Sequence, residues 1–257
     1  MTRTIEAFGA GDLGDIVRSA TSSLPISLRK APANTVPDIA VVGPEASSGA
    51  GEDAPFSVWV GMSPRQVDDA VCGRPGIVAL PWSSNPALRA AAEWAASIEP
   101  YRLESSAILD PSTDASTSLF DQVAVAEALA GPLSDLRLVS WRSDGYVAVA
   151  GFGAGRRAAL TAVYSSALSP RLTATLFADD GDIAVDLPDW TDARPGIVSR
   201  TTMNGIESPP TLWETGMRAA LRRALDGDAD DASQTLRRAR IVTAAVSRVA
   251  APIGSGL

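Results

Sequence analysis

Short strand-like runs alternate with helical stretches through the first hundred residues of the chain. The runs span residues 4–8, 24–30, 38–43, 56–61 and 76–81. Helical patterns follow three of them, at residues 15–20, after Ser63-Pro64, and from Asn85-Pro86 to about Ile98. Such alternation is typical of buried parallel strands joined by helices. The pattern predicts a doubly wound α/β domain over residues 1–104.

The pattern changes beyond residue 104. One helix, predicted near residues 118–130, is followed by six strand-like runs separated by turn signals such as Asp179-Asp180-Gly181. The six runs span residues 135–140, 146–152, 158–164, 172–177, 183–187 and 197–201. Consecutive strands without helices between them indicate an antiparallel or mixed sheet. We therefore expect a second, α+β domain over residues 105–257, with a mostly antiparallel open sheet.

Two amphipathic helices are predicted at the end of the chain. The first has capping-box spacing from Thr211 to Glu214, an apolar face that includes Trp213, and an end near Gly227. The second covers about residues 231–249 and repeats apolar residues at helical spacing. Both apolar stripes are interpreted as core.

A glycine pattern joins the first strand-like run to the first helix. Gly9, Gly11 and Gly14 have the Gly-x-Gly-x-x-Gly spacing of a Rossmann dinucleotide-binding turn, with Asp12 and Leu13 between them. There the first glycine permits the tight turn, the second lets a pyrophosphate approach, and the third lets the helix pack on the strand. An ordinary strand-to-helix turn is the alternative, because glycine-rich chains produce the spacing by chance.

Two cations stand where such a unit recognises the ribose. An NAD-binding unit usually has an acidic residue about 20 residues after the glycines. Here that place holds Arg29 and Lys30, which would pair with a 2'-phosphate and favour NADP. The alternative is a solvated strand end with two surface cations.

The composition excludes several kinds of chemistry. The chain has no histidine and one lysine, Lys30, so histidine triads, histidine-bound zinc and the usual acid/base group near neutral pH are excluded. Its one cysteine, Cys72, excludes an internal disulfide and a multi-cysteine metal site. We expect no metal centre.

Charge and hydropathy restrict the partners. The net charge is −8 and no basic stripe occurs, so we expect no nucleic acid partner. No apolar run approaches the roughly 20 residues that span a bilayer, so we expect no membrane insertion and a cytoplasmic protein.

The order of these features resembles the glucose-fructose oxidoreductase, inositol dehydrogenase and related oxidoreductase family (Gfo/Idh/MocA-like). The resemblance covers most of the chain and is carried by six loose motifs in the same order, at residues 9–14, 58–64, 78–81, 120–125, 181–185 and 230–246. It implies an N-terminal Rossmann domain, a C-terminal α+β domain whose open sheet forms a homodimer face, and a nicotinamide cofactor. Ser63, Pro64 and Pro81 would then border the cofactor.

The chain departs from the family at the residues that transfer protons. The family has Glu-Lys-Pro where this chain has Ala79-Leu80-Pro81, and a histidine where it has Val125; Asp121 remains. The usual alcohol-dehydrogenase chemistry therefore cannot be carried over. By family position, the side chains that would face the cleft are Tyr101, Asp121, Arg142 and Tyr146. The alternative for each is a hydrogen-bonded structural residue.

Three functions are compatible with the sequence. The first is an NADP-dependent oxidoreductase that acts on a small-molecule substrate, for example in biosynthesis, with non-standard proton-transfer residues. The second is a repurposed cleft with non-redox chemistry, such as a cyclase or isomerase. The third is a non-catalytic partner protein on the same scaffold.

Overall fold

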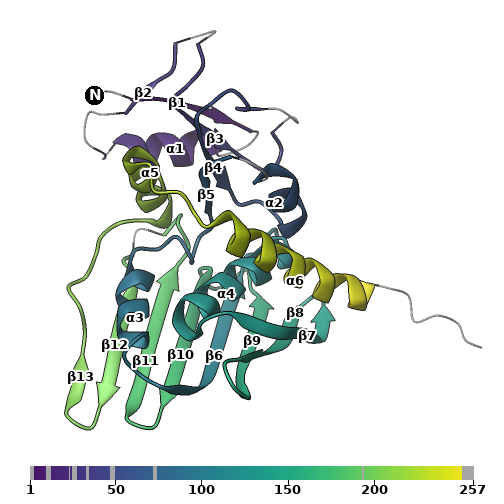
Figure 1. Cartoon of the computed structure of the whole chain (residues 1–257), viewed down its shortest axis with the longest axis vertical. Coiled ribbons are helices and arrows are strands. Elements are labelled where there is room, and N and C mark those ends of the chain that lie inside the picture. Colours follow the sequence, from purple (N-terminus) through teal and green to yellow (C-terminus); the bar gives the residue numbers. More distant parts are fainter. Residues whose placement is uncertain are drawn as a thin grey trace, which may run out of the picture.

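Two β-sheets, one above the other, organise the chain (Figure 1). The structure is a computed structural model that describes residues 3–9, 13–22, 24, 28–32, 35–46, 50–71, 74–192 and 194–250. Of the sequence features above, Gly11, Asp12 and Cys72 lie outside the described residues.

The smaller sheet has five parallel strands in the order β2-β1-β3-β4-β5. Its strands are β1 (Arg3–Phe8), β2 (Leu28–Lys30), β3 (Ile39–Val42), β4 (Phe56–Val60) and β5 (Gly76–Ala79). The helices α1 (Leu13–Ser22) and α2 (Pro64–Ala70) follow β1 and β4. The alternation predicted from the sequence is therefore confirmed as a Rossmann-like sheet with helices.

A helix from the far end of the chain completes this unit. The helix α5 (Gly216–Asp226) lies beside α1 and packs on β4 and β5. Its Met217, Ala220 and Leu221 share one core with apolar side chains of the small sheet. The small sheet thus depends on residues more than a hundred positions beyond its last strand.

The larger sheet has eight strands in the order β13-β12-β11-β10-β6-β9-β8-β7. They are β6 (Pro100–Leu109), β7 (Leu133–Arg142), β8 (Gly145–Phe152), β9 (Arg156–Tyr164), β10 (Arg171–Ala178), β11 (Gly181–Pro188), β12 (Ile197–Thr202) and β13 (Gly205–Glu207). Only the β6–β9 pair is parallel among the described strand pairs of this sheet. The expected mostly antiparallel open sheet is confirmed.

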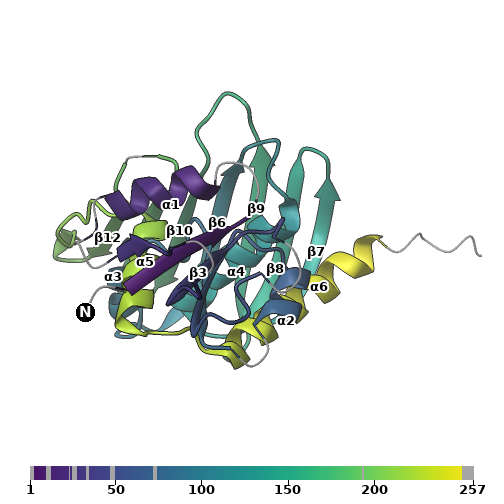
Figure 2. The ribbon, with the colours of Figure 1, turned by 90° about the horizontal axis from the view of Figure 1, so that it is seen from above.

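Helices cover one face of the larger sheet (Figures 1 and 2). The helix α3 (Ala87–Ala95) packs on β11 and β12, and α4 (Ala115–Ala130) packs on β6. The helix α6 (Ala232–Ala250) contacts α2, α4 and β7, and so connects both sheets. Within the described residues, no helix has the combination of length and apolar character that crossing a bilayer requires.

Three details differ from the sequence-based expectations. The strand β6 was not predicted, and it runs through residue 104, where the domain boundary was placed. The N-cap of α5 is Thr215, whose side chain accepts the backbone N–H of Arg218, so the capping box at Thr211 is wrong. Trp213 precedes this helix and is 74% exposed, so it is not a core residue.

Candidate functional site

The carboxyl ends of the parallel strands and two helix N-termini meet at one edge of the small sheet. The helix α1 begins at Leu13, shortly after β1 ends. The helix α5 begins at Gly216, where an added Cβ would lie 3.1 Å from the carbonyl oxygen of Pro81, just after β5. Exposed N–H groups and helix dipoles attract anions, and ligands of open α/β sheets bind at this edge. We call it the carboxyl edge.

The start of the glycine turn fits its expected role. Gly9 has φ +151°, and a Cβ there would lie 3.0 Å from Cδ2 of Leu13 and 3.4 Å from Cα of Gly43. Glycine is thus required where β1, β3 and α1 approach one another. Gly14 differs, because a Cβ on it would meet nothing within 4 Å. The expected close packing of the helix at Gly14 is therefore wrong.

The two cations of β2, Arg29 and Lys30, do not lie at the carboxyl edge itself. Lys30 pairs with Ile5 and Arg29 with Thr4, so both lie before the level of Gly9. Four residues of strand separate Ile5 from Gly9, a distance of about 13 Å at about 3.3 Å per residue. Both cations are exposed, and neither forms an ion pair with a residue that the structure describes.

The loop after β4 leads into α2 and lies close to a tryptophan that follows a strand of the larger sheet. Ser63 is the N-cap of α2 and forms a capping box with Gln66, and Pro64 fills the first helical turn. Gly61 adopts φ +61°, and a Cβ there would lie 4.0 Å from Cη2 of Trp190. Trp190, which follows β11, therefore reaches the carboxyl edge of the small sheet.

Asp121 holds the loop after β5. Its two carboxylate oxygens accept the backbone N–H groups of Trp82 and Ser83, each at 2.8 Å. The side chain of Asp121 is 1% exposed. Burial raises its pKa to about 6, against the lowering effect of the hydrogen bonds from Ser83 and Trp82; nearby Asp189 adds to the rise. A group that titrates near neutral pH thus lies where the two sheets meet.

Trp82 brings an unpartnered donor to this loop. Pro81, which was expected beside a cofactor, directly precedes Trp82. The carbonyl oxygen of Pro81 faces the start of α5. The indole of Trp82 is buried, and its Nε1 has no hydrogen-bond partner among the described residues. An unsatisfied buried donor is a group that a bound molecule can satisfy.

Tyr146 lies deeper, behind Asp121. Its hydroxyl donates to Oε1 of Gln122 at 2.9 Å, and Nε2 of Gln122 donates to Oγ of Ser105 at 2.9 Å. Burial, followed by the charge of Asp121, raises the pKa of Tyr146 well above its usual value. Tyr146 is thus buried and hydrogen-bonded within the larger sheet.

Tyr101 and Arg142 are not brought to the carboxyl edge. Tyr101 is the second residue of β6, at the end where Pro100 pairs with Ala178, whereas Trp190 follows the opposite end of the sheet. Arg142 lies on β7, the edge strand five strands from β11, about 24 Å away at about 4.8 Å per strand. Both are exposed. Of the four expected cleft residues, the structure places only Asp121 beside the loop after β5.

A hollow of about 470 Å³ opens beside this edge, between α1 and the start of α5. It is lined by two tryptophans, Trp190 and Trp213, and by Arg218. The Nε of Arg218 is buried without a hydrogen bond to any described residue; its ion-pair partner, Glu214, stands 3.8 Å away. Because Asp15 also lines the hollow, the aromatic planes and the guanidinium group suit a small polar molecule.

Sequence reasoning missed Trp82, Trp190 and Arg218. Trp82 stands directly after the fifth run and Trp190 shortly after the run at residues 183–187, whereas Arg218 lies inside a predicted helix. A bulky aromatic residue just past a strand end was the available signal. That Trp190 and Arg218 line one hollow, however, depends on how the two sheets are arranged.

Several solved structures of oxidoreductases share this fold over nearly the whole chain. No protein-family model and no curated protein sequence matches the chain. A protein from Desulfitobacterium hafniense assigned as an NADPH-dependent oxidoreductase has 11% identity and a TM-score of 0.73, with 97% of this chain and 96% of that chain covered. At such identity the likeness shows the fold.

Two further structures similar to this chain are dehydrogenases named after sugar-type molecules. UDP-N-acetylglucosamine 3-dehydrogenase from Acidithiobacillus ferrooxidans has 13% identity and a TM-score of 0.70, with 97% of this chain and 98% of that chain covered. Levoglucosan dehydrogenase, in complex with NADH and L-sorbose, has 13% identity and a TM-score of 0.69, with 97% of each chain covered.

Proposed function

We propose that this protein is a nicotinamide-dinucleotide-dependent oxidoreductase that acts on a small polar molecule at the carboxyl edge. The observation that supports this most is the convergence there of the glycine turn at Gly9 with the N-termini of α1 and α5. The oxidoreductases of the same fold lend further support. Fold alone does not determine function, so the proposal rests on the residues that meet at the carboxyl edge.

The residues at this edge fit a dinucleotide. Gly9 and Gly43 keep the backbone open around Leu13, and the first turn of α1 offers N–H groups to a pyrophosphate. Gly61 and Ser63 would border the nicotinamide end. When bound, the cofactor supplies the hydride chemistry, and the protein orients it and excludes water. Trp190, packed near Gly61, serves that exclusion.

NADP is our proposal for the cofactor. Charge supports it, because Arg29 and Lys30 are exposed and without ion pairs to described residues, and a 2'-phosphate needs cations. Both cations lie before the carboxyl edge along β2. Their long side chains must therefore extend toward that edge to reach the phosphate.

Proton transfer must differ from that of the family. Leu80 and Val125, at the positions of the family's lysine and histidine, are buried apolar side chains of the main core. We propose that Asp121 acts as a positioning residue that fixes Trp82 and Ser83. Reduction of an imine or a conjugated system takes up a proton together with the hydride, and at such a site water can supply that proton.

A cofactor-free role is the second candidate. The observation that favours it is the replacement of both proton-transfer residues by side chains that pack in the core. A repurposed cyclase or isomerase, or a non-catalytic partner protein, would then use the hollow at Trp190 without a dinucleotide.

Thermal unfolding with added cofactor separates these candidates. A ligand that binds only the folded state adds about 2.7 kcal/mol at a concentration one hundred times its Kd. We expect NADPH to raise the Tm of the protein, and NADH to raise it less. ATP, which shares the adenine nucleotide but has no nicotinamide, is the control. No rise with either dinucleotide would favour the second candidate.

We also propose a homodimer through the outer face of the larger sheet. Among the described residues, the helices α3, α4 and α6 lie on the other face (Figure 2). The outer face exposes Val147, Val149 and Val163 on the neighbouring strands β8 and β9. Adjacent exposed valines on an open sheet favour pairing with a second copy.

A further inference from the structure

The helix α6 runs beside β7, the edge strand of the larger sheet (Figures 1 and 2). An open groove of about 730 Å³ lies between the second half of α6 and residues 135–138 of β7. Leu136 and Ala245 belong to its floor, and they are 4% and 1% exposed. None of the lining residues belongs to the carboxyl edge, so the groove is separate from the proposed reaction site.

Along α6 the groove has an apolar floor at helical spacing. Ile241, Ala244 and Ala245 are followed about one turn later by Val249. Positions three and four apart lie on one face of a helix, so these side chains form a continuous stripe. The small alanines keep the stripe low, and Val249 is 43% exposed. The groove thus offers an apolar surface that is open to solvent.

Arginines border this apolar floor. Arg137 on β7 and Arg248 on α6 are exposed, and neither forms an ion pair with a residue that the structure describes. Arg240 donates to Asp68 of α2 at 3.3 Å, in an exposed pair of the kind that contributes little to stability. Asp135 is the acidic residue of the described lining. The groove is therefore basic on a chain whose net charge is −8.

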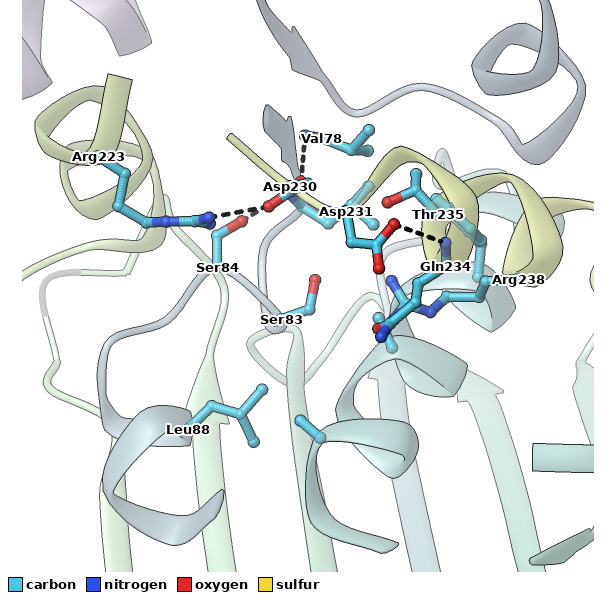
Figure 3. Close-up of a pocket in the computed structure, with 14 residues that line it drawn as sticks. Val78, Ser83, Ser84, Leu88, Arg223, Asp230, Asp231, Gln234, Thr235 and Arg238 are labelled. Carbon is cyan, nitrogen blue, oxygen red and sulfur yellow. Dashed lines mark hydrogen bonds and ion pairs between the residues drawn. The ribbon is translucent and has the colours of Figure 1, made fainter. Parts of the chain in front are cut away.

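The arginines of a second cavity show the contrast. This cavity, of about 190 Å³, lies beside β5 and the start of α6. There Arg223 donates to Asp230 at 3.0 Å (Figure 3), and Arg238 donates to Glu127 at 3.0 Å. Those guanidinium groups are already neutralised within the chain. The groove between β7 and α6 instead presents arginines with which a carboxylate of another molecule can pair.

The strand β7 is a poor template for a further strand. Its pairing with β8 shifts register between Ser134 and Arg137 and again between Leu138 and Ser140. Asp135, inside the first shift, has φ +50°. Such bulges interrupt the row of backbone groups that an added strand would need. An occupant must therefore contact the groove through its side chains, as a docked helix does.

The spacing of the arginines restricts the occupant further. Arg240 and Arg248 are eight positions apart on α6, about 12 Å at about 1.5 Å per residue, so cations stand at both ends of the apolar floor. A fatty acid, with one charged end, would place its tail against a guanidinium group. A second copy presenting the same face would set arginines against arginines. A helix with carboxylates at both ends of an apolar stripe matches the groove.

We propose that the groove between β7 and α6 binds an acidic amphipathic helix of a partner protein. Apolar side chains of that helix, spaced three and four residues apart, pack on Ile241 and Ala244, and its carboxylates pair with Arg137 and Arg248. The volume lies within the about 300–1,000 Å³ of binding pockets. A contact of about two helical turns makes the complex a weak and transient one.

Fluorescence anisotropy with labelled synthetic helices tests the proposal. The probe is a peptide of about 18 residues, long enough to form a helix, with leucine along one face and glutamate along the other. One control peptide has lysine in place of glutamate, and another has serine in place of leucine. We expect saturable binding of the probe with a Kd of about 50 μM, and at least about tenfold weaker binding of both controls.

Three results would overturn the proposal. The first is no binding of the glutamate probe up to about 1 mM. The second is equal binding of the lysine peptide, which would show that the arginines do not select the partner. The third is binding of dodecanoate, measured by calorimetric titration, without binding of the probe, which would assign the groove to a fatty acid.

Variants of exposed residues locate the bound helix without disturbing the core. Arg137→Ser and Arg248→Ser should each weaken binding of the probe about threefold, and the double variant about tenfold. Ala244→Trp, at an exposed position of the groove, should abolish binding. Arg142→Ser, an exposed arginine at the far end of β7 outside the groove, is the matched control. Binding that is unchanged in the double variant, or weakened equally in the control, would refute this site.

Discussion

The carboxylate of Asp121 accepts the backbone N–H of Trp82 at 2.8 Å, which ties α4 to the loop that follows β5. The second oxygen of Asp121 accepts the N–H of Ser83 at the same distance. The loop that borders the proposed reaction site is thus held by a buried carboxylate from the layer beneath the larger sheet. Its protonation state should therefore affect both stability and the loop.

The pH dependence of stability should report on Asp121. Its pKa is raised from 3.8 to about 6, so between these values the folded state binds more protons than the unfolded state. Stability from this group is full below about pH 4 and is lost as pH rises to about 6. One pKa unit is about 1.4 kcal/mol, so the loss is about 3 kcal/mol.

The variant Asp121→Asn isolates this contribution. Other carboxylates titrate equally in both proteins, so the difference in unfolding free energy between them reports on Asp121 alone. We expect the advantage of the native protein to shrink as pH rises from 4 to 6 in urea denaturation experiments. A difference that is constant with pH would contradict the raised pKa.

Asp230 should stabilise β5, the buried edge strand of the small sheet. It accepts the backbone N–H of Val78 at 2.7 Å and pairs with Arg223, so Asp230→Ala leaves a buried donor unpaired. We expect a loss of about 2–4 kcal/mol. Asp228→Ala, which removes the more exposed partner of the same arginine, should cost less than about 1 kcal/mol. Equal losses in urea denaturation would show that the Val78 contact contributes nothing.

The two described glycines of the turn should respond differently to alanine. Gly9→Ala forces a side chain to φ +151° and close to Leu13, so we expect a loss of about 1–3 kcal/mol. Gly14→Ala places a methyl group in open space on α1 and should stabilise by up to about 1 kcal/mol. Thermal unfolding of both variants checks this, and the reverse order would disprove the geometry of the turn.

Arg29 and Lys30 should decide between the two dinucleotides. The double variant Arg29→Gln/Lys30→Gln removes both cations of β2, and we expect about tenfold weaker binding of NADPH, equivalent to about 1.4 kcal/mol, with NADH unchanged within twofold. Calorimetric titration gives both constants. Equal weakening would show that these cations do not contact the 2'-phosphate.

A charge on the outer face of the larger sheet should prevent dimer formation. Val163, 55% exposed on β9, lies at one end of the valine patch, opposite Gly145 and next to Val147. We expect the native protein to elute as a dimer and Val163→Lys as a monomer, measured by light scattering after gel filtration. Val36→Lys, at an equally exposed valine between β2 and β3, is the control. A native monomer would refute the proposed interface.

Strand alternation and turn chemistry made most of the fold predictable. Buried strands such as β3 and β5 are continuous apolar runs, which have few alternatives. The strand β6 was missed because its inward positions include Ser105 and its outward positions include Ile108, so the hydrophobic alternation is weak. Its position between β9 and β10, rather than its own pattern, makes it a strand.

The candidate site was less predictable than the fold. Local spacing identified the glycine turn at Gly9, and the resemblance identified Asp121. The resemblance did not show that Tyr101 lies at the end of β6 that pairs with Ala178, or that the buried Tyr146 is hydrogen-bonded to Gln122. Contacts such as that between Trp190 and Gly61 join residues far apart in sequence, and no local pattern encodes them.

Dinucleotide binding is the most direct test of the proposed function. Six tryptophans, of which Trp82, Trp190 and Trp213 lie at or beside the carboxyl edge, should transfer excitation to bound reduced nicotinamide. Titration of the purified protein with NADPH and with NADH should give saturable sensitised emission, with micromolar Kd for NADPH and weaker binding of NADH. Absence of a saturable signal for both, up to 1 mM, would contradict an oxidoreductase function at this edge.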